Sequence, residues 1–339
     1  MPRDTVWVTV MLLVLVAAAS PTSGQAAGVE GERPAADGGA TRVETALYLI
    51  DLSAIDGSSQ SFTADVFMVL RWHDSRLVSP GGTVRRLELD DVWNPRVQIV
   101  NQRSVRSGFP EVVDVDPDGT VTFRQRFSGE FSARLDLHDF PMDRHTLNVV
   151  LVTPGYSPDE IQLVPFSAGA GGGRASELSI VDWNVGEMTT SSRPYEVGGS
   201  GLSIAGLVGR LDVERKLGFY VSKAFVSIAI ILCMSFVVLW LDPKYVPPRL
   251  SVAVTAMLTL IAYRFLLGQV LPPLSYLTRM DHFMLGSTFI VLMVLVEVVW
   301  STHLHGTERP ERARTLDLLS RIAFPAAFVV LVAAVFWPL

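Results

Sequence analysis

The sequence predicts a two-part membrane protein: an N-terminal antiparallel β-sandwich of the immunoglobulin-like kind, followed by a bundle of four transmembrane helices. Residues 41–216 alternate between apolar and polar side chains, as half-buried strands do. Beyond residue 216 the chain holds four apolar segments, each long enough to cross a bilayer. Only 18% of the 339 residues are charged, against about 25% in a typical soluble domain.

The first 24 residues have the layout of a secretory signal peptide. Arg3 precedes an uncharged apolar run, and small residues follow it up to Gly24. The run is shorter than the roughly 20 residues that a membrane-spanning helix needs, so we expect a cleaved signal over 1–24 rather than an uncleaved anchor helix. Residues 25–40 are rich in Gly, Ala, Glu and Pro, which predicts a disordered leader.

The predicted β-sandwich covers residues 41–216. The even-numbered residues from Phe62 to Trp72 form one apolar face, and similar alternation occurs over 121–127 and 131–137. Turn residues at 116–119 separate such runs, while the glycine-rich stretch 169–173 predicts a mobile loop. We place three tryptophans in the sandwich core: Trp72, Trp93 and Trp183.

The transmembrane domain is predicted over 217–339. Its four spans are expected at 217–241, 250–271, 282–304 and 316–339. Basic residues flank the first and third connectors, while the second has only Arg279. The positive-inside rule therefore places the first and third connectors in the cytoplasm. The β-sandwich comes out on the far side, as the signal peptide independently requires.

Composition narrows the function. The net charge of −6 provides no basic face for a nucleic acid. One cysteine, Cys233, allows no intrachain disulfide and no multi-cysteine metal site. The sequence has none of the glycine-rich phosphate-binding or nucleophile motifs of common enzymes. We therefore expect no enzyme activity, no cofactor and no metal centre.

Five motifs, in this order, resemble those of the pentameric ligand-gated ion channels, or Cys-loop receptors, in their bacterial form. They are Arg71–Leu77, Trp93–Pro95, Phe140–Asp143, Arg215 and Leu271–Tyr276. Ala133 and Leu147 stand where most members carry the cysteine pair, so the disulfide is absent. Ser227 stands where the family keeps a proline in the first helix. The connector 305–315 is too short for the large intracellular domain of animal receptors.

The resemblance implies a homopentamer in a bacterial inner membrane, with the β-sandwich in the periplasm. A small-molecule agonist bound between neighbouring sandwiches would open a central pore for inorganic ions, surrounded by membrane lipids. Two alternatives stay open. In one, protons gate the channel, with His73, His138, His145 and the many carboxylates as titratable candidates. In the other, the protein is a non-conducting ligand sensor.

The second span carries a stripe at helical spacing that the resemblance makes pore-lining. It consists of Ser251, Thr255, Leu258, Ala262, Phe265 and Gln269. Apolar rings in such a pore can gate by dewetting. The selectivity region is expected at Pro247, Pro248 and Arg249, where the sequence leaves cation and anion selectivity open.

The resemblance also assigns binding and coupling residues. The ligand-binding candidates are Phe67, Phe123, Tyr156 and Tyr195. An aromatic box of this kind favours an amine, but the tryptophan of amine-binding receptors is missing, so the ligand class stays open. The gating and coupling candidates are Phe140, Pro141, Asp143, Arg215, Pro272 and Tyr276. Arg215 is expected to pair with an acidic residue, Asp143 being the candidate.

Three ionisable residues fall within the predicted spans: Lys223, Arg264 and Glu297. Charged groups in a bilayer usually face a partner or a cavity. By depth, Lys223 and Arg264 are expected to extend toward the outer interface. We expect Glu297 to pair with Arg249 or Arg321 near the cytoplasmic side, bracing contacts between subunits.

Overall fold

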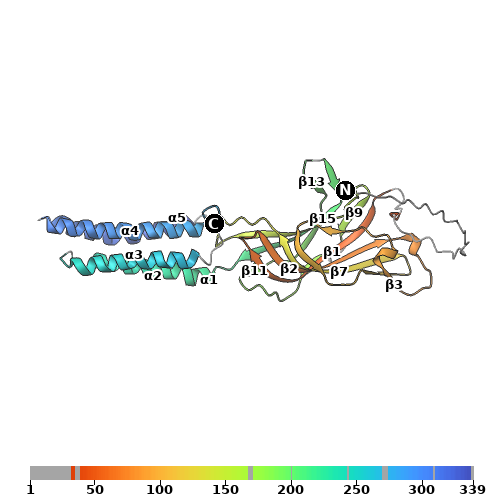
Figure 1. Ribbon diagram of the computed structural model, residues 1–339, viewed down its shortest axis with the longest axis horizontal. Coiled ribbons are helices and arrows are strands. Elements are labelled where there is room, and N and C mark those ends of the chain that lie inside the picture. Colours follow the sequence, from red (N-terminus) through yellow and green to blue (C-terminus); the bar gives the residue numbers. More distant parts are fainter. Residues whose placement is uncertain are drawn as a thin grey trace, which may run out of the picture.

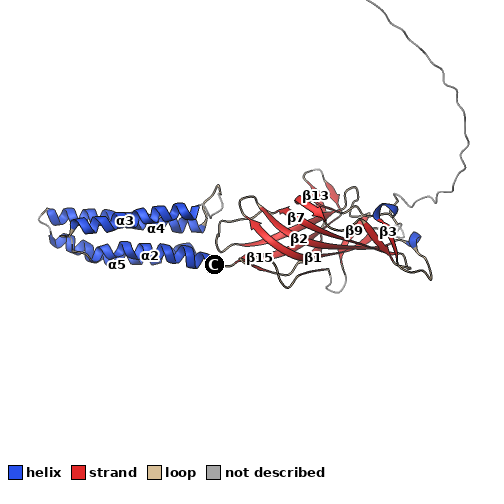
Figure 2. Ribbon diagram, turned by 60° about the horizontal axis from the view of Figure 1, so that its bottom comes forward, coloured by secondary structure: helices blue, strands red, loops and turns tan. Residues whose placement is uncertain are grey.

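The chain forms a β-domain and a helical domain that lie end to end along one long axis (Figure 1). The computed structural model describes residues 32–34, 39–166, 171–199, 201–242, 244–268, 274–307 and 310–336. The predicted signal peptide and most of the predicted leader lie outside the described residues. Figure 2 shows that strands and long helices do not intermix: each belongs to one domain.

The β-domain is a sandwich of two sheets. The eight-stranded sheet contains β1 (Thr41–Asp56), β2 (Ser61–His73), β3 (Arg85–Glu88), β5 (Gln102–Ser107), β6 (Val112–Val115), β7 (Thr120–Ser132), β9 (Ile161–Pro165) and β10 (Gly172–Arg174). The five-stranded sheet contains β4 (Gln98–Ile99), β8 (Arg144–Val152), β11 (Trp183–Val185), β12 (Thr189–Ser192) and β15 (Gly206–Arg215). The hairpin of β13 (Tyr195–Val197) and β14 (Leu202–Ile204) stands apart, and two 3-10 turns lie at Ser75–Leu77 and Leu89–Asp91.

The predicted apolar face of β2 is the sandwich core. Every even-numbered residue from Phe62 to Trp72 is buried, with an exposed fraction of 3% or less. All three predicted core tryptophans are also buried. The Trp72 and Trp93 rings meet edge to face with centroids 5.9 Å apart, an arrangement that aromatic quadrupoles favour.

Two predictions about strands and loops were wrong in part. Residues 133–138 lie beyond the end of β7 and form no strand, although Leu135 and Leu137 are buried. The Gln60 side chain accepts a hydrogen bond from the Leu135 amide at 2.7 Å and donates to its carbonyl at 3.1 Å, taking the place of a strand partner. Within the predicted loop 169–173, β10 begins at Gly172 and pairs in parallel with β1. A Cβ at Gly172 would lie 2.2 Å from the Met188 carbonyl oxygen, so this close approach requires glycine.

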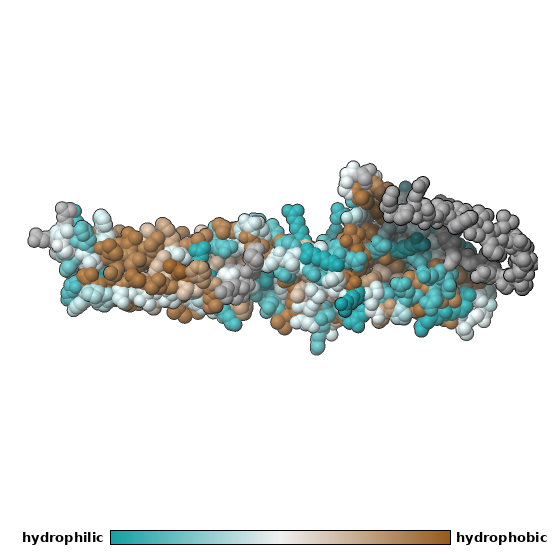
Figure 3. Space-filling view, in the orientation of Figure 1, coloured by the Kyte–Doolittle hydropathy of each residue, from teal (hydrophilic) through white to brown (hydrophobic). Residues whose placement is uncertain are grey.

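The helical domain contains four apolar helical spans long enough to cross a membrane. The first is broken into α1 (Gly218–Tyr220), a π-helical turn η3 (Val221–Phe225), α2 (Val226–Val237) and a 3-10 turn η4 (Val238–Trp240). The others are α3 (Val246–Gly268), α4 (Arg279–Gly306) and α5 (Pro310–Phe336). Thr278 and Asp281 form a capping box that fixes the start of α4. In Figure 3 an apolar band covers this domain, while the β-domain surface is largely polar.

Candidate functional site

The predicted pore-lining stripe lies on the face of α3 that contacts no other helix of its own chain. Ser251, Thr255, Leu258, Ala262 and Phe265 are all exposed, and Leu258 and Phe265 have exposed fractions of 61% and 73%. Gln269 lies outside the described residues. The buried residues of α3 are Arg249, Ala253, Ala256 and Leu260. At about 100° per residue these two sets lie on opposite sides of the helix, so the stripe is available to line a shared pore.

Arg249 does not share the orientation of the stripe. Pro247 and Pro248 are exposed in the first turn of α3, but the Arg249 side chain is fully buried inside its own helical domain. Its guanidinium donates to Asp317 at 3.0 Å and lies 3.9 Å from the Glu297 carboxylate. Of the two expected partners of Glu297, Arg249 is therefore the neighbour, and the contact lies within one chain.

The other ionisable residues of the spans have local contacts. The Lys223 ammonium lies 4.6 Å from the centroid of the Phe219 ring. Arg264 is exposed near the outer end of α3. The Arg321 Nε donates to the Leu239 carbonyl at 3.0 Å, and its guanidinium stacks on the Trp240 ring at 4.7 Å. Arg321 therefore connects α5 to the end of the first span, and it is not the partner of Glu297.

Asp143 and Arg215 form a buried ion pair at the end of the β-domain that faces the helices, as predicted. The guanidinium Nε donates to Oδ1 at 2.7 Å and Nη2 donates to Oδ2 at 2.9 Å. His145 Nε2 lies 2.7 Å from Oδ2. The guanidinium also stacks on the Trp183 ring at 4.2 Å. Because β15 ends at Arg215 and the first span begins three residues later, this pair fixes the joint between the domains.

Burial alone would raise the pKa of Asp143, since a carboxylate loses hydration inside the protein. The hydrogen bonds from His145 and Arg215, together with their charges, outweigh this effect and hold the pKa below its usual value. Asp143 is therefore ionised at neutral pH, and the pair with Arg215 is a full ion pair.

Strong acid is expected to remove this contribution to stability. A lowered folded-state pKa stabilises the protein fully above the unfolded value, about 3.9, and the stabilisation is lost as the pH falls through the folded value. Melting curves of the purified protein should show a steeper loss of stability below about pH 4 than those of Asp143→Asn. Parallel curves for the two proteins would contradict the assignment.

Further contacts, made by Tyr276 and Arg279, join the domains. The Tyr276 hydroxyl accepts a hydrogen bond from the Leu137 amide at 3.0 Å, and its ring stacks on His138 with centroids 4.1 Å apart. The Arg279 Nε donates to Asp139 at 2.7 Å. Pro272 lies outside the described residues. The connector after α3 is thus attached to the β-domain loop 137–143 on its α4 side.

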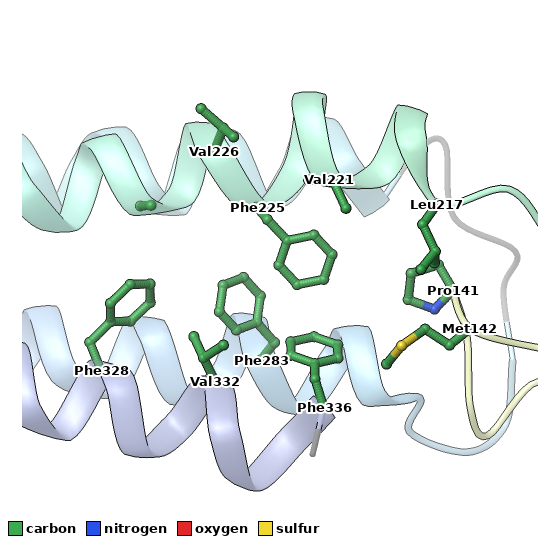
Figure 4. A pocket seen from close by; sticks show the side chains of 11 residues that line it. Pro141, Met142, Leu217, Val221, Phe225, Val226, Phe283, Phe328, Val332 and Phe336 are labelled. Atoms are coloured by element: carbon green, nitrogen blue, oxygen red, sulfur yellow. The ribbon is translucent and has the colours of Figure 1, made fainter. Parts of the chain in front are cut away.

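The tip of that loop reaches into the helical domain. Phe140 is 2% exposed and meets Tyr220 edge to face. Pro141 and Met142 line an apolar cavity of about 390 Å³ between the first span and α5. Figure 4 shows their side chains at one end of it, with Phe225, Phe283 and Phe336 beyond. A movement of the loop must therefore displace side chains of the helices.

A second cavity of about 380 Å³ lies beside the hairpin β13–β14, on the five-stranded sheet. It is lined by Asn148, Val150, Arg193, Pro194, Tyr195, Glu196, Val208 and Arg210. The predicted ligand residue Tyr195 is one of these. Within the described part of the chain, neither Arg193 nor Arg210 has a carboxylate oxygen within the 4.0 Å limit of an ion pair. Two arginines that have no ion-pair partner among the described residues therefore line this cavity.

The other predicted ligand residues lie apart from this cavity. Tyr156 packs against Trp93, whose indole Nε1 donates to its hydroxyl at 3.2 Å. Phe67 lies on β2 beside Phe109, with ring centroids 6.0 Å apart. Phe123 is 8% exposed and belongs to the sandwich core, because it follows the apolar alternation of β7. Phe123 is thus largely buried, and it also lines a small cavity of about 170 Å³.

Comparison with known proteins accounts for both domains. The neurotransmitter-gated ion-channel ligand binding domain family matches residues 29–193, and the neurotransmitter-gated ion-channel transmembrane region family matches residues 228–312. The chain belongs to the pentameric ligand-gated ion channels. It is accordingly a multi-pass membrane protein of a ligand-gated channel family.

Curated relatives of this channel differ in what their names say they respond to. A proton-gated ion channel of Gloeobacter violaceus is 26% identical over 292 residues, which cover 85% of this chain and 80% of the relative. Gamma-aminobutyric acid receptor subunits alpha-2 of Mus musculus and Homo sapiens are each 23% identical over 282 residues. Those matches cover 78% of this chain and 60% of each subunit, so the channel spans less than two thirds of their length.

Sequence reasoning missed three groups in this channel. His145 was considered as a titratable residue but not as the second partner of Asp143. Arg193 and Arg210 were not singled out, although Arg193 lies just before β13 and Arg210 lies on β15. Asp317 was also missed; its carboxylate within the mostly apolar fourth span was the available signal.

Proposed function

We propose that this channel is a homopentamer of a bacterial inner membrane in which an agonist, bound at the cavity beside β13–β14, opens a pore lined by α3. The exposed stripe on α3 carries this proposal. It has hydroxyl groups at one end and apolar side chains in the middle and outer half, and it faces away from every helix of its own chain. Five such faces around an axis would form a pore with apolar constrictions.

We infer further that the agonist carries an anionic group. Arg193 and Arg210 bring two positive charges to one small cavity, and among the described residues that line it Glu196 is the one acidic residue. Guanidinium groups bind carboxylates and phosphates through paired, charge-assisted hydrogen bonds. An amine-binding aromatic box has less support, because Phe123 is in the core and Tyr156 packs on Trp93.

Currents through the purified protein in planar bilayers test this proposal. At fixed pH and under a KCl gradient, mono- and dicarboxylates, phosphate esters, amino acids and amines are applied in turn. We expect the acids to evoke current and simple amines to fail. Arg193→Gln and Arg210→Gln should each raise the half-maximal concentration by roughly ten- to a hundredfold, since a hydrogen bond to a charged group contributes about 1.5–3 kcal/mol.

Arg134→Gln is the matched control, because Arg134 is an exposed arginine outside the cavity. It should leave the response to acids unchanged. Equal activation by amines, or unchanged responses in both cavity variants, would overturn the anionic assignment. If a verified pentamer gives no current with any compound of the panel and at any pH, the result would instead favour the non-conducting sensor.

Proton gating is the second candidate, favoured by one contact. His138 stacks on Tyr276 at the joint between the domains, and its Nδ1 lies 2.5 Å from Asp136. Imidazole is the side chain that gains charge on mild acidification, and this one touches the connector to α4. A pH step without ligand separates the two candidates: current that His138→Gln abolishes would support protons as the agonist.

A further inference from the structure

The cytoplasmic end of the pore helix carries a charge that is wholly enclosed by protein. Arg249, in the first turn of α3, is the largest side chain in the described part of the chain that is fully buried. Its Nη2 donates to Asp317 Oδ1 at 3.0 Å and its Nη1 donates to the Ser301 hydroxyl at 3.3 Å. The Ser301 hydroxyl in turn donates to the same Asp317 oxygen at 2.7 Å. These three groups form a closed ring of hydrogen bonds, which we call the latch.

The latch joins three helices. Arg249 belongs to α3, Ser301 to α4 and Asp317 to α5. The backbones of α3 and α5 do not pack closely on each other: α3 packs mainly on α2 and α4, while α5 packs mainly on α4. The long Arg249 side chain therefore provides a direct connection between the pore helix and α5.

Burying this ion pair costs desolvation free energy, so stability alone does not explain its presence. Asp317 and Ser301 are as enclosed as Arg249, with exposed fractions of 2% and 0%. Apolar residues of similar volume often stabilise a protein as well as a buried ion pair or better, whereas removing one partner is strongly destabilising. What the pair adds is structural specificity, because its hydrogen bonds form only when the three helices lie in one arrangement.

The opposite side of α5 makes this arrangement sensitive to its surroundings. Leu318, Leu319 and Ile322 follow Asp317 closely and have exposed fractions of 53%, 69% and 75%. The same turns of α5 hold one buried anchor to the pore helix and an apolar surface without a partner in its own chain. A displacement of α5 at this depth must strain or break the latch.

We propose that Arg249 is a positioning residue of the pore: through Asp317 and Ser301 it fixes the cytoplasmic end of α3 to α4 and α5, and its charge takes no part in the ion path. The pore mouth then has no ring of positive charge from residue 249, and ion selectivity is set by other residues. The pore-facing Ser251 lies two residues further on, so a shift of the latch moves the first ring of the pore.

Thermal unfolding of the detergent-purified full chain tests the latch without any current. Arg249→Met and Asp317→Leu should each lower the unfolding midpoint by roughly 5–10 °C, because each leaves a buried charge unpaired. The double variant should regain most of this loss, since it removes both hydrogen-bonded charges together and leaves at this site only Glu297, which accepts no hydrogen bond. Glu297→Gln is the control: Glu297 lies 3.9 Å from the guanidinium and accepts no hydrogen bond, so it should change the midpoint less. Additive losses in the double variant would overturn the latch.

Ion flux into proteoliposomes separates positioning from mere stability. The double variant, although stable, should differ from the unmodified channel in the concentration of the activating carboxylate or phosphate ester, or of protons, that gives half-maximal flux. The reason is that the link between α5 and α3 is gone. The reversal potential under a KCl gradient should be the same as in the unmodified channel. A changed ratio of K⁺ to Cl⁻ permeability would place Arg249 in the ion path, and an unchanged half-maximal concentration would reduce the latch to packing; either result overturns the proposal.

Discussion

Replacing Arg215 with alanine is expected to abolish the evoked current and to lower the stability of the channel by about 3–5 kcal/mol, the cost of leaving one partner of a buried ion pair alone. The Asp143 and Arg215 side chains are only 1% and 12% exposed. Among the described residues, the substitution leaves the buried carboxylate with His145 as its one remaining side-chain partner. It also removes the cation that packs between the Trp183 and Phe140 rings.

Arg144→Ala is the matched control for this experiment. Arg144 pairs with Glu214 at 2.9 Å across the same two strands, but these side chains are 74% and 49% exposed. Exposed pairs of this kind contribute about 0–1 kcal/mol. Melting curves and bilayer currents are measured for both variants at equal protein recovery. An intact agonist response in Arg215→Ala would show that this ion pair does not couple the β-domain to the first span.

The pairing of Arg215 with Asp143 could be predicted because both residues stand in recognisable motifs at the ends of their strands. The core face of β2 could be predicted because strict alternation leaves one arrangement in which six apolar side chains are buried. The same reasoning applied to residues 131–137 failed, since alternation does not show whether a neighbouring backbone or a side chain such as Gln60 satisfies the amide groups. The spacing of apolar residues indicates which side chains are buried. A strand also needs a neighbouring strand with which its backbone can form hydrogen bonds.

The spacing of residue types along the sequence cannot predict contacts between segments that lie far apart in the chain. Arg249 and Asp317 are 68 residues apart, and nothing local in either segment indicates the other. Arg193 and Arg210 meet at one cavity only because β15 turns back beside the hairpin β13–β14. Phe123 was assigned to the ligand site by its position in the family pattern, although its own alternation with Val121 indicated the core. The alternation predicted the burial of Phe123 correctly, and its part in the ligand site stays a prediction.

Replacing Leu258 with serine is expected to produce current in the absence of any agonist. Leu258 lies in the middle of the α3 stripe and is 61% exposed in the single chain. In a pentamer five such side chains would form an apolar ring that excludes water from a narrow pore and so blocks ions. A hydroxyl in each position favours the wetted pore. A shift of only 1.4 kcal/mol multiplies the open population about tenfold, and five subunits contribute to it.

Leu266→Ser distinguishes a gate from a general loosening of the helix. Leu266 has nearly the same exposure, 59%, but it lies eight residues further on, which turns it about 80° away from Leu258 around the helix. Both substitutions exchange the same side chains in one helix, so a current that arises from a weakened helix should occur in both. Basal proteoliposome flux that rises only in Leu258→Ser places the constriction on the stripe. Equal flux in both variants would show that the current arises from a weakened helix and would contradict a constriction at Leu258.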